Sequence, residues 1–86
     1  MQITEVKVLP VSEGKVKAYV TIIFDDCFVI RDLKIIHGFN GYFVSMPSRK
    51  AKDGTHFDIA HPINKETRQM MEQKIMTEYK KLLPPE

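Results

Sequence analysis

The chain has 86 residues, of which 43% are hydrophobic and 28% are charged. This length and composition are typical of one small globular domain over residues 1–86, and they exclude a disordered chain. The formal net charge of +2 is too small to indicate a nucleic-acid partner by itself, and no apolar run approaches the roughly 18 residues of a membrane span.

The first segments of the chain have the pattern of β-strands. Residues 3–9 are rich in β-branched side chains and stop at Pro10, which cannot donate to a ladder and marks a strand end or a sheet edge. Residues 12–14 predict a turn. Residues 15–25 alternate apolar and other side chains, which predicts a strand with one buried face. That face carries Val16, Ala18, Val20, Ile22 and Phe24.

The next segments predict two more strands. Asp25 and Asp26 separate two apolar runs and indicate a tight hairpin turn. Residues 27–36 are almost continuously apolar, as in a central strand or in one covered on both faces in a dimer. Cys27 is expected to be a small buried hydrophobic residue. Residues 37–41 predict a loop and residues 42–46 a fourth strand, and four strands with short connections favour an antiparallel meander.

A long connection and a helix complete the chain. Residues 47–63 form the connection, and loops of this length are often functional. The pair Asp53-Gly54 predicts a turn, after which residues 55–60 return as a short strand. Asn64 is the expected N-cap of a helix over residues 65–83, which Pro84-Pro85 stops. The apolar stripe of this helix comprises Thr67, Met71, Ile75, Tyr79 and Leu82 or Leu83.

These elements together predict an α+β fold: an antiparallel β-meander of about four to five strands with a C-terminal α-helix. A core of this size is marginal, so a homodimer would be a natural way to bury more surface. The single cysteine excludes an intramolecular disulfide and a multi-thiol zinc site, and the first residues lack the layout of a secretion signal. We therefore expect a reducing, cytoplasmic setting.

All of the excess positive charge lies in residues 47–86, which carry eight basic and six acidic side chains. The densest cluster consists of Arg49, Lys50 and Lys52, next to Ser48. Such cations can neutralise phosphates, and Ser48 can donate a hydrogen bond to one, whereas the simpler alternative is a solvated basic loop. Arg68, one turn inside the helix, could reach the same anion. The lysines farther along the helix are better explained as a salt-bridged solvent face.

Aromatic residues flank the basic cluster, and aromatic rings beside cations can stack single-stranded bases. Core packing is the simpler interpretation for Phe43 and Phe57. Because side chains alternate along a strand, Tyr42 and Phe43 are expected on opposite faces.

Residues 56–61 hold two histidines and Asp58 but offer no obvious fourth ligand, so we expect no metal site and no cofactor. Asp58 is expected instead to cap the loop or to pair with Arg49 or Arg68. The chain contains no glycine-rich phosphate loop and no nucleophile elbow, and Asp58 and His61 would need a buried cleft to act as acid and base. We therefore expect no enzyme activity and no small-molecule substrate.

Several motifs resemble those of one bacterial family. Residues 38–50 follow the pattern G-x-N-G-x-F-V-x-M-P-S-[RK]-[RK], a D-G pair occupies residues 53–54, and D-I-A-H-P-I-N occupies residues 58–64, with Phe28-Val29 before them and Thr67-Arg68 after them. This combination resembles the stage V sporulation protein G (SpoVG) family of septation regulators over nearly the whole chain. The resemblance implies small homodimeric proteins, linked to sporulation and septum formation, that bind DNA, and in some members RNA, as gene regulators.

Carried over by position, the resemblance places the family's basic loop on Arg49 and Lys50 and its helix-start arginine on Arg68, while Lys52 lies where the family varies. The predicted nucleic-acid-binding residues are Ser48, Arg49, Lys50, Lys52 and Arg68, with DNA or RNA as the partner and no membrane partner. The alternative is a protein-interaction module of the division machinery, in which the long connection docks a partner protein.

Overall fold

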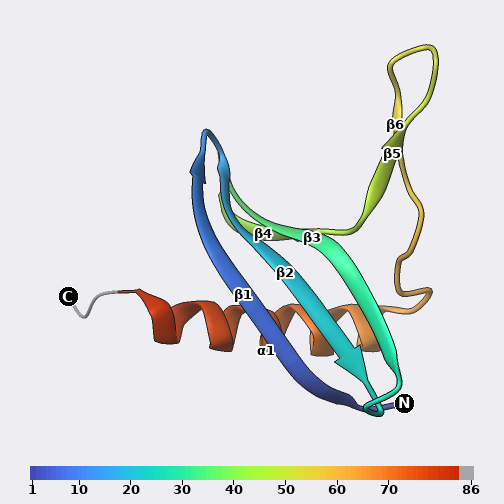
Figure 1. Cartoon of the computed structure of the whole chain (residues 1–86). Coiled ribbons are helices and arrows are strands. Elements are labelled where there is room, and N and C mark those ends of the chain that lie inside the picture. Colours follow the sequence, from blue (N-terminus) through green and yellow to red (C-terminus); the bar gives the residue numbers. More distant parts are fainter. Residues whose placement is uncertain (84–86) are drawn as a thin grey trace.

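The computed structural model describes residues 1–83, and Pro84-Pro85, expected to stop the helix, lie outside the described residues. Strands β1 to β4 form an antiparallel meander in chain order, and β5 and β6 form a separate two-stranded sheet (Figure 1). The prediction of an α+β meander with a C-terminal helix is confirmed. The elements are β1 (Ile3–Glu13), β2 (Val16–Phe24), β3 (Phe28–Gly38), β4 (Gly41–Ser45), β5 (Ser48–Lys50), β6 (His56–Asp58) and α1 (Lys65–Leu82).

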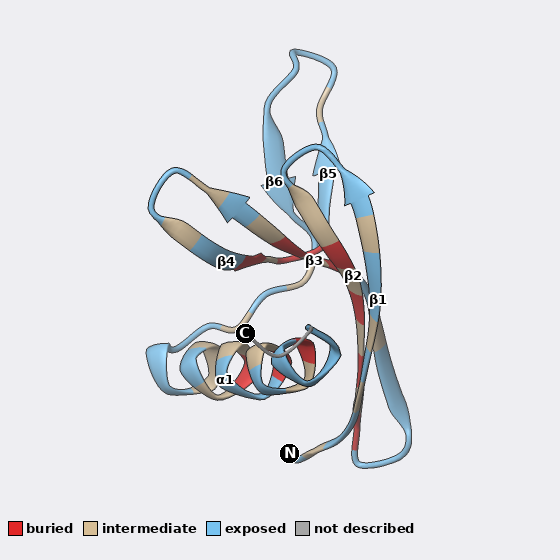
Figure 2. Cartoon of the chain, turned by 90° about the vertical axis from the view of Figure 1, so that its left-hand side faces the viewer, coloured by how far each residue is buried: buried red, intermediate tan, exposed pale blue. Residues whose placement is uncertain are grey.

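The hydrophobic core lies between one face of the meander and one stripe of α1 (Figure 2), and the helix crosses the strands of the curved sheet (Figure 1). The predicted face of β2 is buried from Ala18 to Phe24, and the predicted stripe of α1 is buried at its centre. The prediction is wrong at the end of the stripe, where Leu82 and Leu83 are exposed. The core residues are Ala18, Val20, Ile22, Phe24, Leu33, Ile35, Val44, Met46, Met71, Ile75 and Tyr79.

A β-bulge in β3 explains its continuous apolar run. Leu33 pairs with Val20 but Ile30 pairs with Ile22, so β3 holds one residue more than β2 in this stretch. Asp32 has a φ of 66°, a left-handed conformation that aspartate tolerates better than most residues. Because the extra residue reverses the alternation, Ile30 and Leu33 both face the helix side. The continuous apolar run of β3 therefore arises because the bulge changes which residues of this central strand face the helix.

Strand β1 is longer than expected, because the chain does not leave the sheet at Pro10. Pro10 pairs with Ala18, and β1 continues to Glu13 as an edge strand. The interpretation of Pro10 as a sheet edge is confirmed, and its interpretation as a strand end is wrong. The turn occupies Gly14, whose φ is 63°, and Lys15, so it overlaps the predicted turn at residues 12–14 only at its last residue.

The expected tight turn at Asp25-Asp26 is present, and both residues have positive φ angles of 50° and 55°. The Cys27 amide donates to the carbonyl of Phe24 over 3.0 Å, which closes the turn. Cys27 therefore belongs to the turn rather than to β3. It is exposed, so the prediction of a buried cysteine is wrong.

The connection between β3 and β4 is shorter than the predicted loop. His37 and Gly38 extend β3, and Gly41 already belongs to β4, so the turn contains Phe39 and Asn40. The side chain of Phe39 is fully exposed at this turn.

The side of the meander that faces away from α1, here called the open face, also carries apolar side chains. Register places Leu9 beside Tyr19, Ile23 beside Val29, and Ile36 beside Phe43 on this side. Leu9, Val29 and Phe43 are exposed. The open face thus carries exposed apolar side chains beside polar ones such as Lys7 and Lys34, and no element of residues 1–83 covers it (Figure 2).

Ile75 and Ile63 give a matched test of the core. Ile75 is completely buried between sheet and helix, whereas Ile63 is 91% exposed. We expect Ile75→Ala to lower the free energy of unfolding by about 2–5 kcal/mol, because it leaves a cavity. Ile63→Ala should change it by less than about 0.5 kcal/mol. Urea denaturation at a fixed protein concentration measures both, and equal losses would contradict this placement of the core.

Candidate nucleic-acid interface

Residues 48–58 form a hairpin that stands away from the sheet and the helix, and we call it the hairpin arm (Figure 1). Ser48 pairs with Asp58, Arg49 with Phe57, and Lys50 with His56. All residues of both strands are exposed. Most of the connection that was expected to be a long loop is therefore a two-stranded ribbon.

The tip of the hairpin arm is the predicted Asp53-Gly54 turn. The Ala51 amide donates to the Thr55 carbonyl over 2.7 Å, and the Gly54 amide donates to the Ala51 carbonyl over 3.0 Å. Gly54 has a φ of 93°, which a residue with a side chain would adopt only with strain. The Asp53 carboxylate accepts hydrogen bonds from the Thr55 hydroxyl at 2.7 Å and from the Thr55 amide at 3.0 Å. These bonds, the hydroxyl one first, lower the pKa of Asp53.

Strand β5 was not predicted, and β6 is shorter than the expected strand over residues 55–60. Both strands lie outside the main sheet, so neither face of the ribbon is buried. Without a buried face, a strand has no apolar alternation to reveal it. The turn pair and the polar residues around it were the only local signal.

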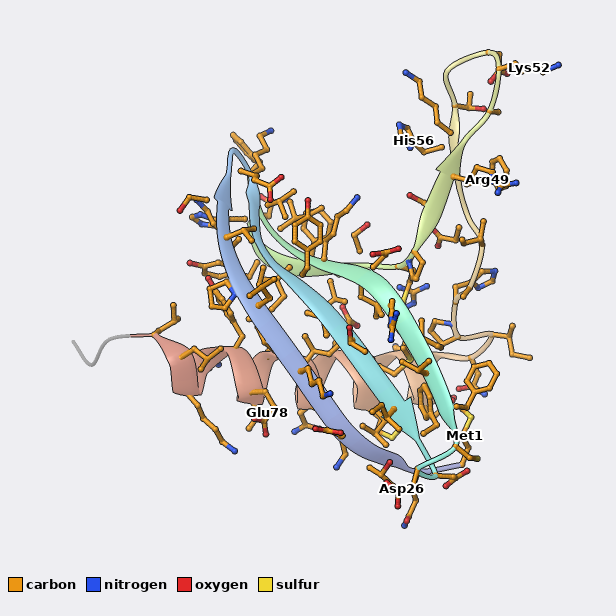
Figure 3. All side chains as sticks on the ribbon, in the orientation of Figure 1. Met1, Asp26, Arg49, Lys52, His56 and Glu78 are labelled. Atoms are coloured by element: carbon orange, nitrogen blue, oxygen red, sulfur yellow. The ribbon has the colours of Figure 1, made fainter. Side chains whose placement is uncertain are left out.

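The ribbon divides the predicted cations between its two sides. Successive side chains of a strand point to opposite faces, and paired residues share a face. Arg49 and Phe57 therefore share one face, and Lys50 and His56 share the other. In Figure 3, Arg49 and Lys52 point to one side of the hairpin arm and His56 points to the opposite side. The arm thus presents positive charge in two directions.

Carboxylates do not neutralise these cations in the described part of the chain. Within residues 1–83 the single salt bridge joins Lys81 to Glu78 at 3.0 Å, in the last turns of α1. The expected pairing of Asp58 with Arg49 or Arg68 is wrong. Asp58 shares the ribbon face of Lys50 rather than that of Arg49, and Arg68 lies on the helix. The three cations of the arm are therefore available to an external anion.

Arg68 lies on a different element from the other predicted site residues. The Asn64 side chain accepts a hydrogen bond from the Thr67 amide at 2.7 Å, which confirms the predicted N-cap. Arg68 follows in the first turn and is half-buried. The chain descends from the arm before α1 begins, so Arg68 is set apart from the arm tip (Figure 1). Its contact with the same anion stays a prediction.

The core-packing interpretation of Phe43 and Phe57 is wrong, because each is 48% exposed. Phe43 lies on the open face of the sheet, and Phe57 lies on a ribbon with no layer behind it. Tyr42 lies on the helix side of the sheet, so the expectation that Tyr42 and Phe43 lie on opposite faces is confirmed. Its ring stacks on His37 at 4.5 Å and contacts Tyr79 at 5.8 Å between centroids. Burial is the main reason that the pKa of Tyr79 is raised.

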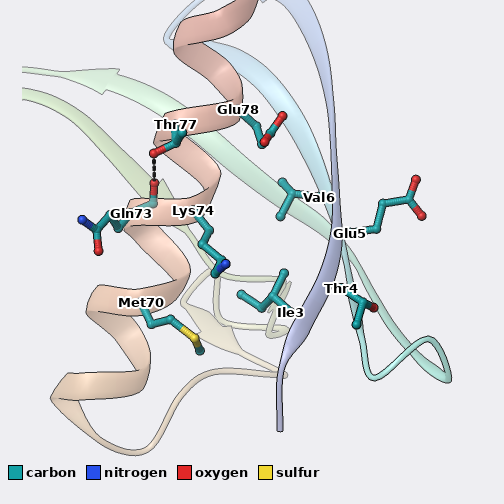
Figure 4. Close-up of a pocket in the computed structure, with 9 residues that line it drawn as sticks. All are labelled: Ile3, Thr4, Glu5, Val6, Met70, Gln73, Lys74, Thr77 and Glu78. Carbon is teal, nitrogen blue, oxygen red and sulfur yellow. Dashed lines mark hydrogen bonds between the residues drawn. The ribbon is translucent and has the colours of Figure 1, made fainter.

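Hollows of the molecular surface lie outside the hairpin arm. A groove of about 610 Å³ runs between β1 and α1, with Ile3, Val6 and Met70 among its lining residues (Figure 4). A smaller cavity of about 270 Å³ has an almost entirely apolar lining that includes His61. Asp58 lines neither hollow, so the cleft that an Asp58–His61 acid–base pair would need is not formed by them.

The described residues contain neither a metal-ligand cluster nor a membrane-spanning helix. Within residues 1–83 no three His, Cys, Asp or Glu side chains are grouped so that they could hold a metal ion. His61 is exposed, and its Nδ1 lies 3.0 Å from the Pro62 carbonyl oxygen. No helix in this range is long and apolar enough to cross a membrane.

Comparison with known proteins gives consistent matches along the chain. The sequence model of the SpoVG family matches residues 1–81. A protein of Anaeromyxobacter sp. (strain Fw109-5) is 63% identical over 79 residues, which are 92% of this chain and 81% of the relative. A Myxococcus xanthus protein is 60% identical over 83 residues (96% and 84%), and a Caldicellulosiruptor bescii protein is 48% identical over 84 residues (96% and 96%). All three are named as septation proteins SpoVG.

The order of the arm tip should depend on the charge of Asp53. Its pKa is lowered below 3.8 in the folded state, so the stabilisation is complete above the ordinary pKa and is lost as the pH falls through the lowered one. We expect the Thr55 amide resonance to titrate with a midpoint below 3.8. Thr55→Val removes the hydroxyl donor and should raise the midpoint of the residue 55 amide. NMR spectra across an acid titration measure both, and an unperturbed midpoint in the native chain would contradict the hydrogen bonds.

Proposed function

The chain belongs to the SpoVG family, a septation-related family, and we propose that it is a non-enzymatic, nucleic-acid-binding regulator that acts in the cytoplasm. The observation that carries this proposal is the hairpin arm. It holds Arg49, Lys50 and Lys52 away from the body of the protein, and none of them is paired with a carboxylate within residues 1–83. Unpaired cations on a projecting element are suited to the phosphates of DNA or RNA.

The shape of the arm supports the same function. A two-stranded antiparallel ribbon is narrow enough to enter the major groove of B-DNA. Arg49 and Lys50 point to opposite faces of the ribbon, so an inserted arm would direct one cation toward each wall of the groove. Ser48, which shares the face of Lys50, could donate to a phosphate oxygen. Phosphate contacts would supply most of the affinity, which makes binding sensitive to salt.

We further propose that the working unit is a homodimer that pairs through the open face of the sheet. Leu9, Val29 and Phe43 are exposed there, and large apolar side chains exposed on an uncovered sheet face indicate an interface. A second copy would also bury apolar area that the small core of one chain lacks. Two copies carry two hairpin arms, so binding of the first arm would raise the effective concentration of the second.

Two charge-matched double variants test the arm. We expect Arg49→Ala with Lys50→Ala to weaken duplex DNA binding at least tenfold at about 100 mM salt and to lower the slope of log affinity against log salt by about two. Lys80→Ala with Lys81→Ala removes the same charge from the last turn of α1 and should have much less effect. Fluorescence anisotropy titrations at several salt concentrations measure affinity and slope.

Equal losses in the two double variants would mean that only net charge matters and would contradict a site on the arm. Unchanged affinity in both would remove nucleic acid as the ligand of this surface. Protein partners that remain bound after nuclease treatment of a bacterial lysate, and that depend on Arg49 and Lys50, would then favour the alternative of a protein-interaction module.

The dimer has a separate test. Sedimentation equilibrium should give twice the 10.0 kDa mass of one chain. Phe43→Glu places a charge on the open face and should shift the protein to a monomer, because an unpaired charge is costly to bury. Phe39→Glu makes the same change at the exposed β3–β4 turn and should leave the mass unchanged. A Phe43→Glu protein that remains dimeric would exclude the open face as the interface.

A further inference from the structure

Phe57 is the one apolar residue in strands β5 and β6 of the hairpin arm. Both faces of this ribbon are open to solvent, so its strands have no core to fill, and every other residue of β5 and β6 is polar or charged. Phe57 is 48% exposed, and its ring has no aromatic partner among the described residues. An aromatic side chain that breaks the local pattern without supporting the fold indicates a binding role.

The surroundings of Phe57 define what it could bind. Register places Phe57 directly opposite Arg49, so the two side chains share one face. Side chains opposed in this way have Cβ atoms roughly 4.5–5.5 Å apart. Lys52 at the tip points to the same side as Arg49 (Figure 3). Carboxylates do not pair with either cation within residues 1–83. This face therefore combines a flat apolar ring with two available positive charges.

A nucleotide with an unpaired base has the matching chemistry. Its base offers a flat surface to an aromatic ring, and its phosphate offers negative charge to a cation one side chain away. In a continuous duplex both faces of each base are covered by neighbouring bases, so the ring could reach only the groove edges. The combination of ring and cations on one face favours single-stranded nucleic acid over duplex.

We propose that the Arg49–Phe57 face of the hairpin arm binds an unpaired nucleotide, with Phe57 stacked on the base and Arg49 and Lys52 in contact with the flanking phosphates. This inference rests on the proposed nucleic-acid function and deepens it, because it adds contacts to an unpaired base to the phosphate contacts that the arm could make with either duplex or single strand. The opposite face carries Lys50, His56 and the carboxylate of Asp58 and lacks a phenyl ring, so it would contribute phosphate contacts through Lys50 rather than stacking on a phenyl ring.

The test measures three variants of Phe57 against a fluorescein-labelled 12-nucleotide thymidine strand and against a mixed-sequence duplex. Loss of one base–aromatic stack corresponds to a fall in affinity of about 5- to 150-fold. We expect Phe57→Ala and Phe57→Leu to show this loss for the single strand, with a far smaller loss for the duplex. Phe57→Tyr keeps a ring and should retain binding to both. Phe57→Leu keeps an apolar side chain, so it separates stacking from general apolar contact.

Phe39→Ala is the matched control, because it removes an exposed phenylalanine from a different hairpin tip and should leave single-strand affinity unchanged. An abasic strand of the same length keeps the phosphates and lacks the bases. The native protein should bind it as weakly as the Phe57→Ala protein binds the thymidine strand, and Phe57→Ala should weaken abasic binding no further. Circular dichroism melting curves confirm that each variant is folded.

Two results would overturn the stacking proposal: Phe57→Ala binding that equals the native affinity for the thymidine strand, or a loss that is equal for single strand and duplex. Either could occur while Arg49→Ala with Lys50→Ala still abolishes binding, which would leave the proposed nucleic-acid function standing. If that double variant loses no affinity for any strand, the arm is not a nucleic-acid surface and both proposals fail together.

Discussion

The packing of one helical stripe on one face of the meander is the interaction on which the rest of the structure depends. Met71, Ile75 and Tyr79 are the buried residues of α1, and they belong to one core cluster with side chains from β2, β3 and β4. This contact fixes the side of the sheet on which the helix lies. Two parts of the molecule contribute no buried side chain to this core: the open face of the sheet and the hairpin arm. The surfaces proposed for association and for nucleic-acid binding are these two parts.

The core could be predicted because burial imposes a pattern on the sequence. Residues from Ala18 to Phe24 alternate strictly, and the helix repeats its apolar residues every three to four positions, as packing on a single face requires. The predictions were wrong where backbone geometry overrides that pattern. Asp32 inserts a bulge that reverses the alternation of β3, and Cys27 is taken up by a turn in which both preceding residues have positive φ angles. Neither event has a composition signal of its own.

The position of the candidate site in the chain could be predicted from the sequence, but its three-dimensional structure could not. The cluster of Arg49, Lys50 and Lys52 and the Asp53-Gly54 turn were visible as residue types. The ribbon was not, because strands without a buried face carry no alternation. Without the register, Phe57 could not be distinguished from a core residue, nor could Asp58 be placed on the face away from Arg49. Face assignments on an isolated ribbon come from cross-strand pairing, and a single sequence does not contain that information.

Pro10 has a consequence for how copies of this protein meet at high concentration. Strand β1 is an outer strand of the sheet, and its backbone offers a row of donors and acceptors that could template the addition of further strands. Pro10 interrupts that row because it has no N–H, and the register shift after it bends the same margin. Growth of the sheet into a fibril from this side is thereby obstructed. Addition of a further strand along β1 is therefore disfavoured at the position of Pro10.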